Sequence, residues 1–126
     1  MTAYSAVTRE VVRDLERLLG AHNVTVNPEK LASYSRDEVG LQFWDREYRA
    51  EVLVFPESTG HVSALLAYAD SRRIPVTPRG AGTGLSGGAV PAFGGIVMAF
   101  DRMNRILEID LENLTITAEP GVVTAE

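Results

Sequence analysis

Glycine is concentrated in one stretch of the chain, and this stretch limits the possible folds more than any other feature. Residues 80–95 contain seven of the eleven glycines, together with Pro91. A helix is unfavourable there, because glycine loses much backbone entropy and proline removes an amide hydrogen bond. Clustered glycines instead allow a ligand to approach the backbone closely, and successive amides can form a nest for an anion. The sequence therefore predicts a long loop whose chemistry suits a phosphate or pyrophosphate.

A strand, a helix and a second strand are predicted immediately before this loop. Residues 51–55 form an apolar run that ends at a proline, and Ser58 is a suitable helix cap. Apolar residues then recur at helical spacing from Val62 to Ala69. Residues 74–78 return as an extended run, which completes a β-α-β unit. We expect its two strands to form a parallel pair with a right-handed crossover.

Shorter elements are predicted towards the N-terminus. A helix begins after Thr8 and keeps apolar residues on one face through Leu19. An extended segment at 24–26 and a short helix at 28–34 follow. Residues 35–50 mix charged and aromatic side chains without periodicity, and we interpret them as a surface loop whose acidic residues, Asp37 among them, are solvated.

Three further strands are predicted after the glycine-rich stretch, at residues 96–100, 106–110 and 114–119. The last two flank a short polar turn and are expected to form a hairpin. Together with the preceding elements they indicate an α+β fold, in which helices flank a small mixed sheet that contains the β-α-β unit.

Composition excludes several classes of protein. The chain has no cysteine, which rules out disulfides, cysteine-ligated metal centres and thiol catalysis within these residues. Two histidines without a carboxylate cluster predict no metal site. The net charge of −5 disfavours a nucleic-acid surface but is compatible with a small anion site. No secretory signal or transmembrane segment is recognisable, so we expect a cytoplasmic protein that is at most peripheral to a membrane.

Four interpretations of the glycine-rich loop can be compared. A P-loop needs a lysine after its last glycine, but the only lysine is Lys30. Residues 82–87 match the GxGxxG pattern, yet the glycines that follow prevent the helix which that motif must open. Residues 84–88 match the GxSxG pattern of hydrolases, which requires a later histidine, whereas His22 and His61 both come earlier. A phosphate-binding loop that leads into another strand fits best, and a flexible connection without a ligand is the structural alternative.

The sequence PRGAGTGLSGGAVP at residues 78–91, with PES before the central helix and ITAEPGV at 116–122, resembles the N-terminal FAD-binding domain of FAD-linked oxidases. These are flavoproteins of the vanillyl-alcohol oxidase or p-cresol methylhydroxylase (PCMH) type. Within them the resemblance is strongest to the D subunit of glycolate oxidase and to D-lactate and D-2-hydroxyacid dehydrogenases, and it extends from about Leu31 onward. It implies that the chain contains the first lobe of a PCMH-type FAD-binding domain.

The resemblance implies that the loop binds the pyrophosphate of FAD through backbone amides, with Pro78 fixing its start. The loop residues concerned are Arg79, Gly80, Ala81, Gly82, Thr83, Gly84, Leu85 and Ser86. Thr83 would add its hydroxyl group, and Pro120 and Gly121 match a turn near the adenine end of the cofactor. Some relatives carry a flavin-bonded histidine at the position of Thr83, so FAD is expected to be non-covalent here. His61 also departs from relatives, which often have a glutamate in that helical turn.

The resemblance further implies that other residues complete the enzyme. We interpret residues 1–50 as an N-terminal helical segment and loop, and residues 51–126 as the first, pyrophosphate-binding lobe, truncated at its C-terminus. A second lobe and a cap domain would carry the hydroxy-acid site. No catalytic residue is therefore expected in this chain, and part of its apolar surface should be exposed.

The implied function is that of an FAD-dependent dehydrogenase or oxidase. It would oxidise a small 2-hydroxy acid, of the glycolate or D-lactate type, to a 2-oxo acid by hydride transfer to flavin. The 126 residues alone are expected to be inactive. Iron–sulfur partner subunits are implied in the glycolate oxidase case. The alternative is a non-catalytic α/β module that binds a nucleoside diphosphate or a partner protein.

Overall fold

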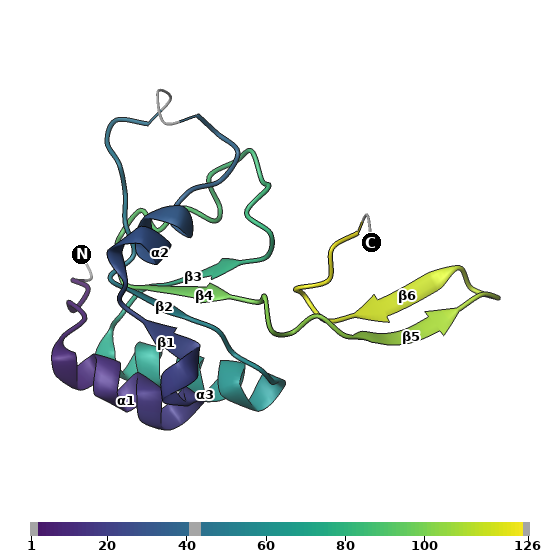
Figure 1. Ribbon diagram of the computed structural model, residues 1–126, viewed down its shortest axis with the longest axis horizontal. Coiled ribbons are helices and arrows are strands. Elements are labelled where there is room, and N and C mark those ends of the chain that lie inside the picture. The colour runs from purple at the N-terminus through teal and green to yellow at the C-terminus, as the bar shows by residue number, and fades with distance from the viewer. Residues whose placement is uncertain (1–2, 41–43, 125–126) are drawn as a thin grey trace.

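A four-stranded mixed sheet lies at the centre of the computed structural model, which describes residues 3–40 and 44–124 (Figure 1). The strand order is β1 (Val24–Thr25), β2 (Val52–Val54), β4 (Ile96–Ala99) and β3 (Val76–Arg79). β1 is antiparallel to β2, whereas β2, β4 and β3 are parallel to one another. This sheet and its flanking helices confirm the predicted α+β fold.

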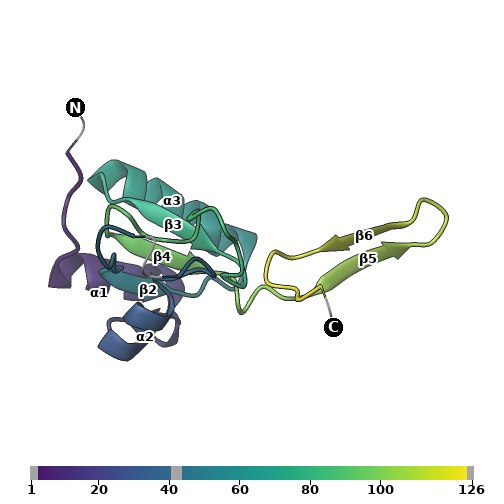
Figure 2. The same ribbon diagram turned by 90° about the horizontal axis from the view of Figure 1, so that it is seen from above.

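Helices cover both faces of the sheet. α1 (Arg9–Leu19) and α3 (Thr59–Arg72) lie together on one face, and the short α2 (Pro28–Ser33) lies on the other (Figures 1 and 2). A 3₁₀ turn, Ala21–Asn23, connects α1 to β1. Within the described ranges, no helix has the length and apolar character needed to cross a bilayer.

Alternate side chains of the two central strands enter two separate cores. One core lies between the sheet and the pair α1 and α3, and the other lies between the sheet and α2. The strand residues of the first core are Val52, Val54, Ile96 and Met98, and residues 53, 55, 97 and 99 belong to the second. A strand that is buried on both faces needs a continuous apolar run, which the segments around 52–55 and 96–99 provide.

The position of β4 corrects one prediction. The β-α-β pattern predicts that β2 and β3 are neighbours, but β4 lies between them, although all three strands are parallel. Every residue of β4 is buried, whereas β3 is partly exposed and contains Pro78. Proline donates no amide hydrogen bond and is confined to edge strands. The most completely apolar strand therefore takes the centre of the sheet.

Both long helices begin at the predicted capping hydroxyl. Thr8 accepts a hydrogen bond from the amide of Val11 at 3.3 Å, and Ser58 accepts one from the amide of His61 at 3.1 Å. His61 in turn accepts the amide of Glu57 through Nδ1 at 3.1 Å. This histidine therefore reaches back past the cap to the residue before it, whereas the glutamate of a capping box accepts the amide of the cap residue itself.

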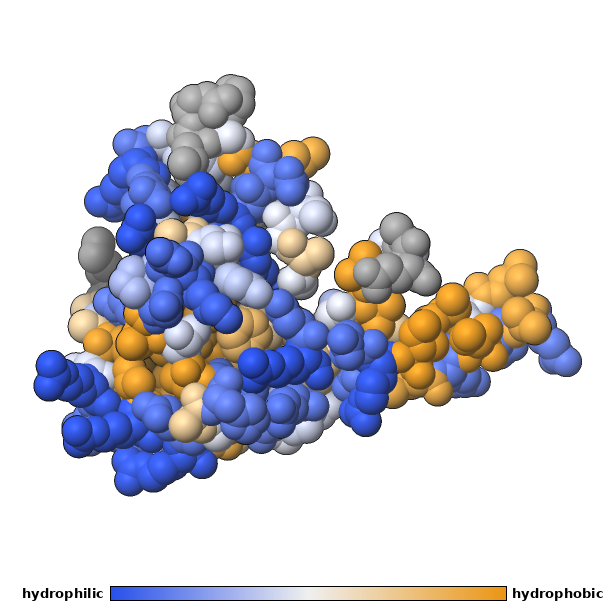
Figure 3. Space-filling view, viewed as in Figure 1, coloured by the Kyte–Doolittle hydropathy of each residue, from blue (hydrophilic) through white to orange (hydrophobic). Residues whose placement is uncertain are grey.

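The predicted hairpin is formed by β5 (Ile106–Asp110) and β6 (Thr115–Ala118), and it extends away from the sheet (Figures 1 and 2). Its turn is held by Asp110, whose Oδ1 accepts the amides of Glu112 and Asn113, each at 3.1 Å. Exposed apolar side chains gather along the hairpin (Figure 3): Ile106, Leu107, Ile109, Leu111, Leu114 and Ile116.

Two adjacent leucines of α3 test the first core. Leu65 is fully buried, whereas Leu66 is 44% exposed. We expect Leu65→Ala to lower the free energy of unfolding by about 2–5 kcal/mol, because it leaves a cavity between α3 and the sheet. Leu66→Ala makes the same change of helix propensity and should cost less than about 1 kcal/mol. Urea denaturation followed by circular dichroism measures both losses, and equal losses would contradict this packing.

Candidate functional site

The predicted site residues lie at the edge of the sheet where the parallel strands end. Pro78 and Arg79 are the last residues of β3, and residues 80–95 form a loop that contains no helix. This excludes the GxGxxG and GxSxG interpretations, because both motifs require a helix at once. β3 and β4 point toward the hairpin in Figure 1. In sheets with parallel strands, ligands bind beyond the carboxyl ends, which is where this loop begins.

The loop and the turn after β6 lie next to each other. An added Cβ at Gly80 would lie 3.8 Å from the carbonyl oxygen of Pro120. The amide of Gly121 donates to the carbonyl oxygen of Met103 at 2.8 Å, and a side chain at this position would overlap the carbonyl oxygen of Phe100. Glycine at position 121 therefore allows the chain to turn against the end of β4, and this turn brings Pro120 to the loop.

The backbone amides at the start of the loop are available to a ligand. Among the described residues, no acceptor receives a hydrogen bond from an amide of residues 80–86. Thr83, Leu85 and Ser86 are exposed. Exposed amides and hydroxyl groups in such a row can donate to the oxygen atoms of a phosphate or pyrophosphate. The loop therefore offers hydrogen-bond donors that an anion could use.

The side chain of Arg79 supports the loop. Its Nη1 donates to the carbonyl oxygens of Tyr34, at 3.3 Å, and of Arg36. Its guanidinium carbon lies 5.4 Å from the centroid of the Tyr34 ring. Gly82 has a φ of +73°, and a Cβ at this position would overlap the same guanidinium. Arg79 therefore packs between the loop and the end of α2, and its Nη1 is engaged by backbone carbonyl groups of the chain itself.

Part of the segment between α2 and β2 holds the far end of the loop, so its interpretation as a solvated surface loop is wrong for Asp37. The Oδ2 atom of Asp37 accepts the amide of Gly87 at 2.9 Å. The amide of Glu38 donates to the carbonyl oxygen of Gly84 at 3.1 Å. Trp44 lies so close to Gly87 that an added Cβ would be 2.7 Å from its ring. No sequence pattern marks these contacts, because Asp37 and Gly87 are 50 residues apart.

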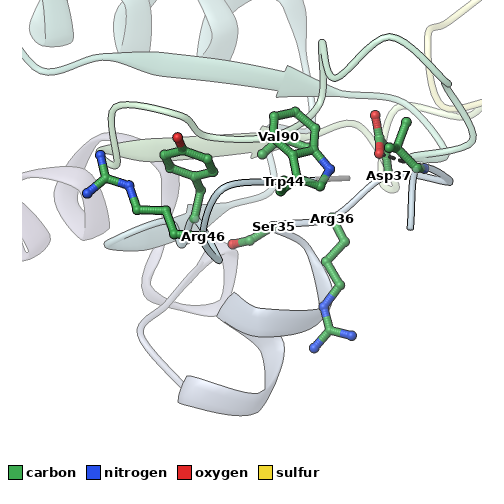
Figure 4. Close-up of a pocket in the computed structure, with 8 residues that line it drawn as sticks. Ser35, Arg36, Asp37, Trp44, Arg46 and Val90 are labelled. Atoms are coloured by element: carbon green, nitrogen blue, oxygen red, sulfur yellow. Dashed lines mark hydrogen bonds between the residues drawn. The ribbon is translucent and has the colours of Figure 1, made fainter. Parts of the chain in front are cut away.

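Trp44 and Asp37 also line a small pocket beside the loop (Figure 4). Val90, which follows the glycine cluster, lies next to Trp44 in this view. The indole ring packs edge-on against Tyr48, with centroids 5.9 Å apart. Aromatic packing therefore joins the loop to the segment that precedes β2.

Comparison with known proteins identifies the family of the chain. Residues 50–126 match the family model described as the FAD binding domain. The chain belongs to this family. It is 36% identical over 122 residues to glycolate oxidase subunit GlcD of Bacillus subtilis (strain 168), which covers 95% of this chain and 25% of that protein. It is also 36% identical over 120 residues to a D-lactate dehydrogenase of Anaerostipes hadrus, with 95% and 24% covered.

Solved structures of PCMH-type oxidases share the fold. p-Cresol methylhydroxylase with substrate bound matches with a TM-score of 0.76 and 24% identity, over 92% of this chain and 23% of that one. A 4-ethylphenol oxidase from Gulosibacter chungangensis matches with a TM-score of 0.78 and 27% identity, over 96% and 24%. The predicted PCMH-type FAD-binding fold is confirmed, and the chain spans about a quarter of the length of these relatives.

The donors of this FAD-binding domain fit the cofactor of the family. FAD carries a pyrophosphate, whose oxygen atoms accept hydrogen bonds, and the amides of residues 80–86 face no acceptor in the part of the chain that the structure describes. The hydroxyl groups of Thr83 and Ser86 add two donors in the same exposed stretch. Backbone dipoles of this kind stabilise an anion without a cationic side chain, in a chain whose net charge is −5.

Tyr34 fixes α2 of the FAD-binding domain against the end of β4. Its phenol donates to Oδ2 of Asp101 at 2.7 Å, and its ring packs edge-on against Phe55 with centroids 5.6 Å apart. Burial, followed by the hydrogen bond to Asp101, raises the pKa of Tyr34 to about 12. The phenol therefore keeps its proton at neutral pH and remains a hydrogen-bond donor. The Tyr34 carbonyl that receives Arg79 is held in place by the same contacts.

Two glycines of the loop test its conformation. We expect Gly82→Ala to lower the free energy of unfolding by about 1–2 kcal/mol, because its φ is positive and the guanidinium of Arg79 must move. Gly84→Ala should change it by less than about 0.5 kcal/mol, because no atom lies within 4 Å of its added Cβ. Urea unfolding measures both. If both variants had the stability of the parent, the described conformation at Gly82 would be refuted.

Proposed function

We propose that residues 78–86, with Pro120 and Gly121 beside them, hold the pyrophosphate and the adjoining adenosine of FAD. The protein that contains this domain would oxidise a small 2-hydroxy acid to a 2-oxo acid. The observation that carries the proposal is that the amides of residues 80–86 donate to no acceptor among the described residues, at the carboxyl edge of a parallel sheet. In this proposal residues 51–126 form the first lobe of the domain, and residues 1–50 are an N-terminal helical segment and loop.

In this mechanism the residues of this chain bind the FAD and orient it. Amides of residues 80–86 donate to the pyrophosphate, and the Thr83 hydroxyl adds a further hydrogen bond. Pro78 sets the start of the loop at the end of β3, and Gly121 places Pro120 against Gly80. The bound FAD supplies the acceptor for the hydride that leaves the substrate. Threonine offers no nitrogen for a bond to the flavin, so the cofactor is held non-covalently.

The names of the relatives support the substrate class. They include glycolate oxidase, D-lactate dehydrogenase and a D-2-hydroxyglutarate dehydrogenase of Stutzerimonas stutzeri (strain A1501). All of these names refer to 2-hydroxy acids. The groups that bind the hydroxy acid and remove its proton would lie in a second lobe and a cap domain, outside these residues. A cytoplasmic protein, peripheral to a membrane through iron–sulfur partner subunits, completes the proposal by analogy with glycolate oxidase.

Two valine variants test whether the pyrophosphate lies on the loop. Added Cβ atoms at Gly84 and Gly88 meet nothing within 4 Å, so the two positions are matched in the space beside the backbone. We expect Gly84→Val to weaken FAD binding at least roughly tenfold, because its side chain occupies the ligand's place, and Gly88→Val to bind FAD as the parent does. Titration of the full-length gene product with FAD measures both. Equal affinities in the two variants would remove Gly84 from the site.

Thr83→Val and Thr83→Ser examine the hydroxyl. Valine keeps the shape and loses the hydrogen bond, so we expect FAD affinity to fall roughly threefold to tenfold, whereas serine should retain most of it.

Calorimetric titration with FAD, ADP and FMN measures which part of the cofactor is bound. Binding of FAD and ADP without FMN would support the proposal. Binding of ADP as tightly as FAD, with no turnover of any 2-hydroxy acid, would instead support a non-catalytic nucleotide-binding module.

A further inference from the structure

We propose that Asp37 is a positioning residue of the flavin site. Its carboxylate holds the amide of Gly87 and thereby keeps the amides of residues 80–86 presented at the edge of the sheet. The inference rests on the proposed function. It concerns residues outside the matched family model, which begins at residue 50, whereas Asp37 lies in the segment that precedes it.

The segment of residues 34–38, here called the strap, contacts the stretch of residues 79–87, which is the first half of the loop with the residue before it, at the start, the middle and the end of this stretch. At the start, the Arg79 guanidinium donates to the carbonyl oxygens of Tyr34 and Arg36. In the middle, the amide of Glu38 donates to the carbonyl oxygen of Gly84 at 3.1 Å. At the end, Asp37 accepts the amide of Gly87 at 2.9 Å. The row of available amides therefore lies between two anchored ends.

The Asp37 carboxylate is itself held in a fixed orientation. Its Oδ1 accepts the amide of Val39 at 2.9 Å, while Oδ2 accepts Gly87. A hydrogen bond to an ionised carboxylate is about twice as strong as one between neutral groups. Trp44 also holds Gly87 in place, because its ring lies against this residue, where φ is +78°. The end of the loop is thus fixed by a charged hydrogen bond and by an aromatic surface.

Asp37 also limits where an anion can bind. Because the carboxylate occupies the Gly87 amide, this amide is not available to a phosphate oxygen. A second negative charge next to it would be repelled, whereas residues 80–86 carry no acidic side chain. The strap therefore directs the pyrophosphate to the first half of the loop, which is the half with the available amides.

Three variants test this role, each in the full-length gene product. Asp37→Ala removes the acceptor of the Gly87 amide. Asp37→Asn keeps an acceptor oxygen without the charge. Glu38→Ala is the matched control, because its contact with Gly84 is made by the backbone amide. The readouts are hydrogen exchange at the Gly87 amide without flavin, and the dissociation constant of FAD from titration.

We expect Asp37→Ala to raise both the exchange rate of Gly87 and the FAD dissociation constant roughly tenfold, as the loss of a charged hydrogen bond implies. Asp37→Asn should raise both values by a smaller factor, roughly threefold, because a neutral hydrogen bond is weaker than a charged one, and Glu38→Ala should match the parent. The proposal is overturned if Asp37→Ala binds FAD as tightly as the parent. If Asp37→Ala fails to fold, Asp37→Asn decides, and unchanged Gly87 exchange in that variant together with unchanged affinity would overturn the proposal.

Failure of this inference differs from failure of the proposed function. A parent protein that binds no FAD overturns the proposed function, and the exchange rate of Gly87 in Asp37→Ala then still decides whether the carboxylate holds the loop. A parent that binds FAD, with an Asp37→Ala variant of equal affinity, overturns only the positioning role.

Discussion

Burial of the central strands on both faces is the constraint on which the structure depends. Each of β2 and β4 sends alternate side chains into two cores, one under α1 and α3 and one under α2. A strand of this kind tolerates no polar residue and no edge position, so β4 lies between β2 and β3. The three strands are parallel, and their carboxyl ends therefore share one edge of the sheet. The glycine-rich loop leaves from that edge because β3 ends there.

The helices, the strands and the hairpin could be predicted because their signals are local. Thr8 and Ser58 cap the helices that they were expected to cap, since a hydroxyl before an apolar periodic run is a short-range feature. The order of the strands could not be predicted from the same signals. The runs at 74–78 and 96–100 both follow the central helix and are short. The entirely apolar run at 96–100 takes the centre because it packs against two helical layers, whereas the run at 74–78 contains Thr77 and two prolines and lies at the edge.

The candidate site also has a part that could be predicted from the sequence and a part that could not. The loop was predictable because glycine clustering is visible in the sequence itself, and the resemblance of residues 78–91 to flavoproteins agrees with the family of the chain. The roles of Asp37 and Tyr34 were not. Their contacts with Gly87 and Arg79 join residues 50 and 45 positions apart, and the spacing around a carboxylate does not distinguish a solvated group from one that accepts an amide.

The separation of Asp37 from Gly87 has a consequence for the order of folding. Closing a connection of 50 residues costs conformational entropy before the contact returns any stabilisation. β2, α3 and β3 lie between the strap and Gly87 in the chain, so this contact closes a long connection that contains a β-α-β unit. By this argument the conformation of the loop between Arg79 and Gly87 is fixed late, after the core that lies between its contacts has formed.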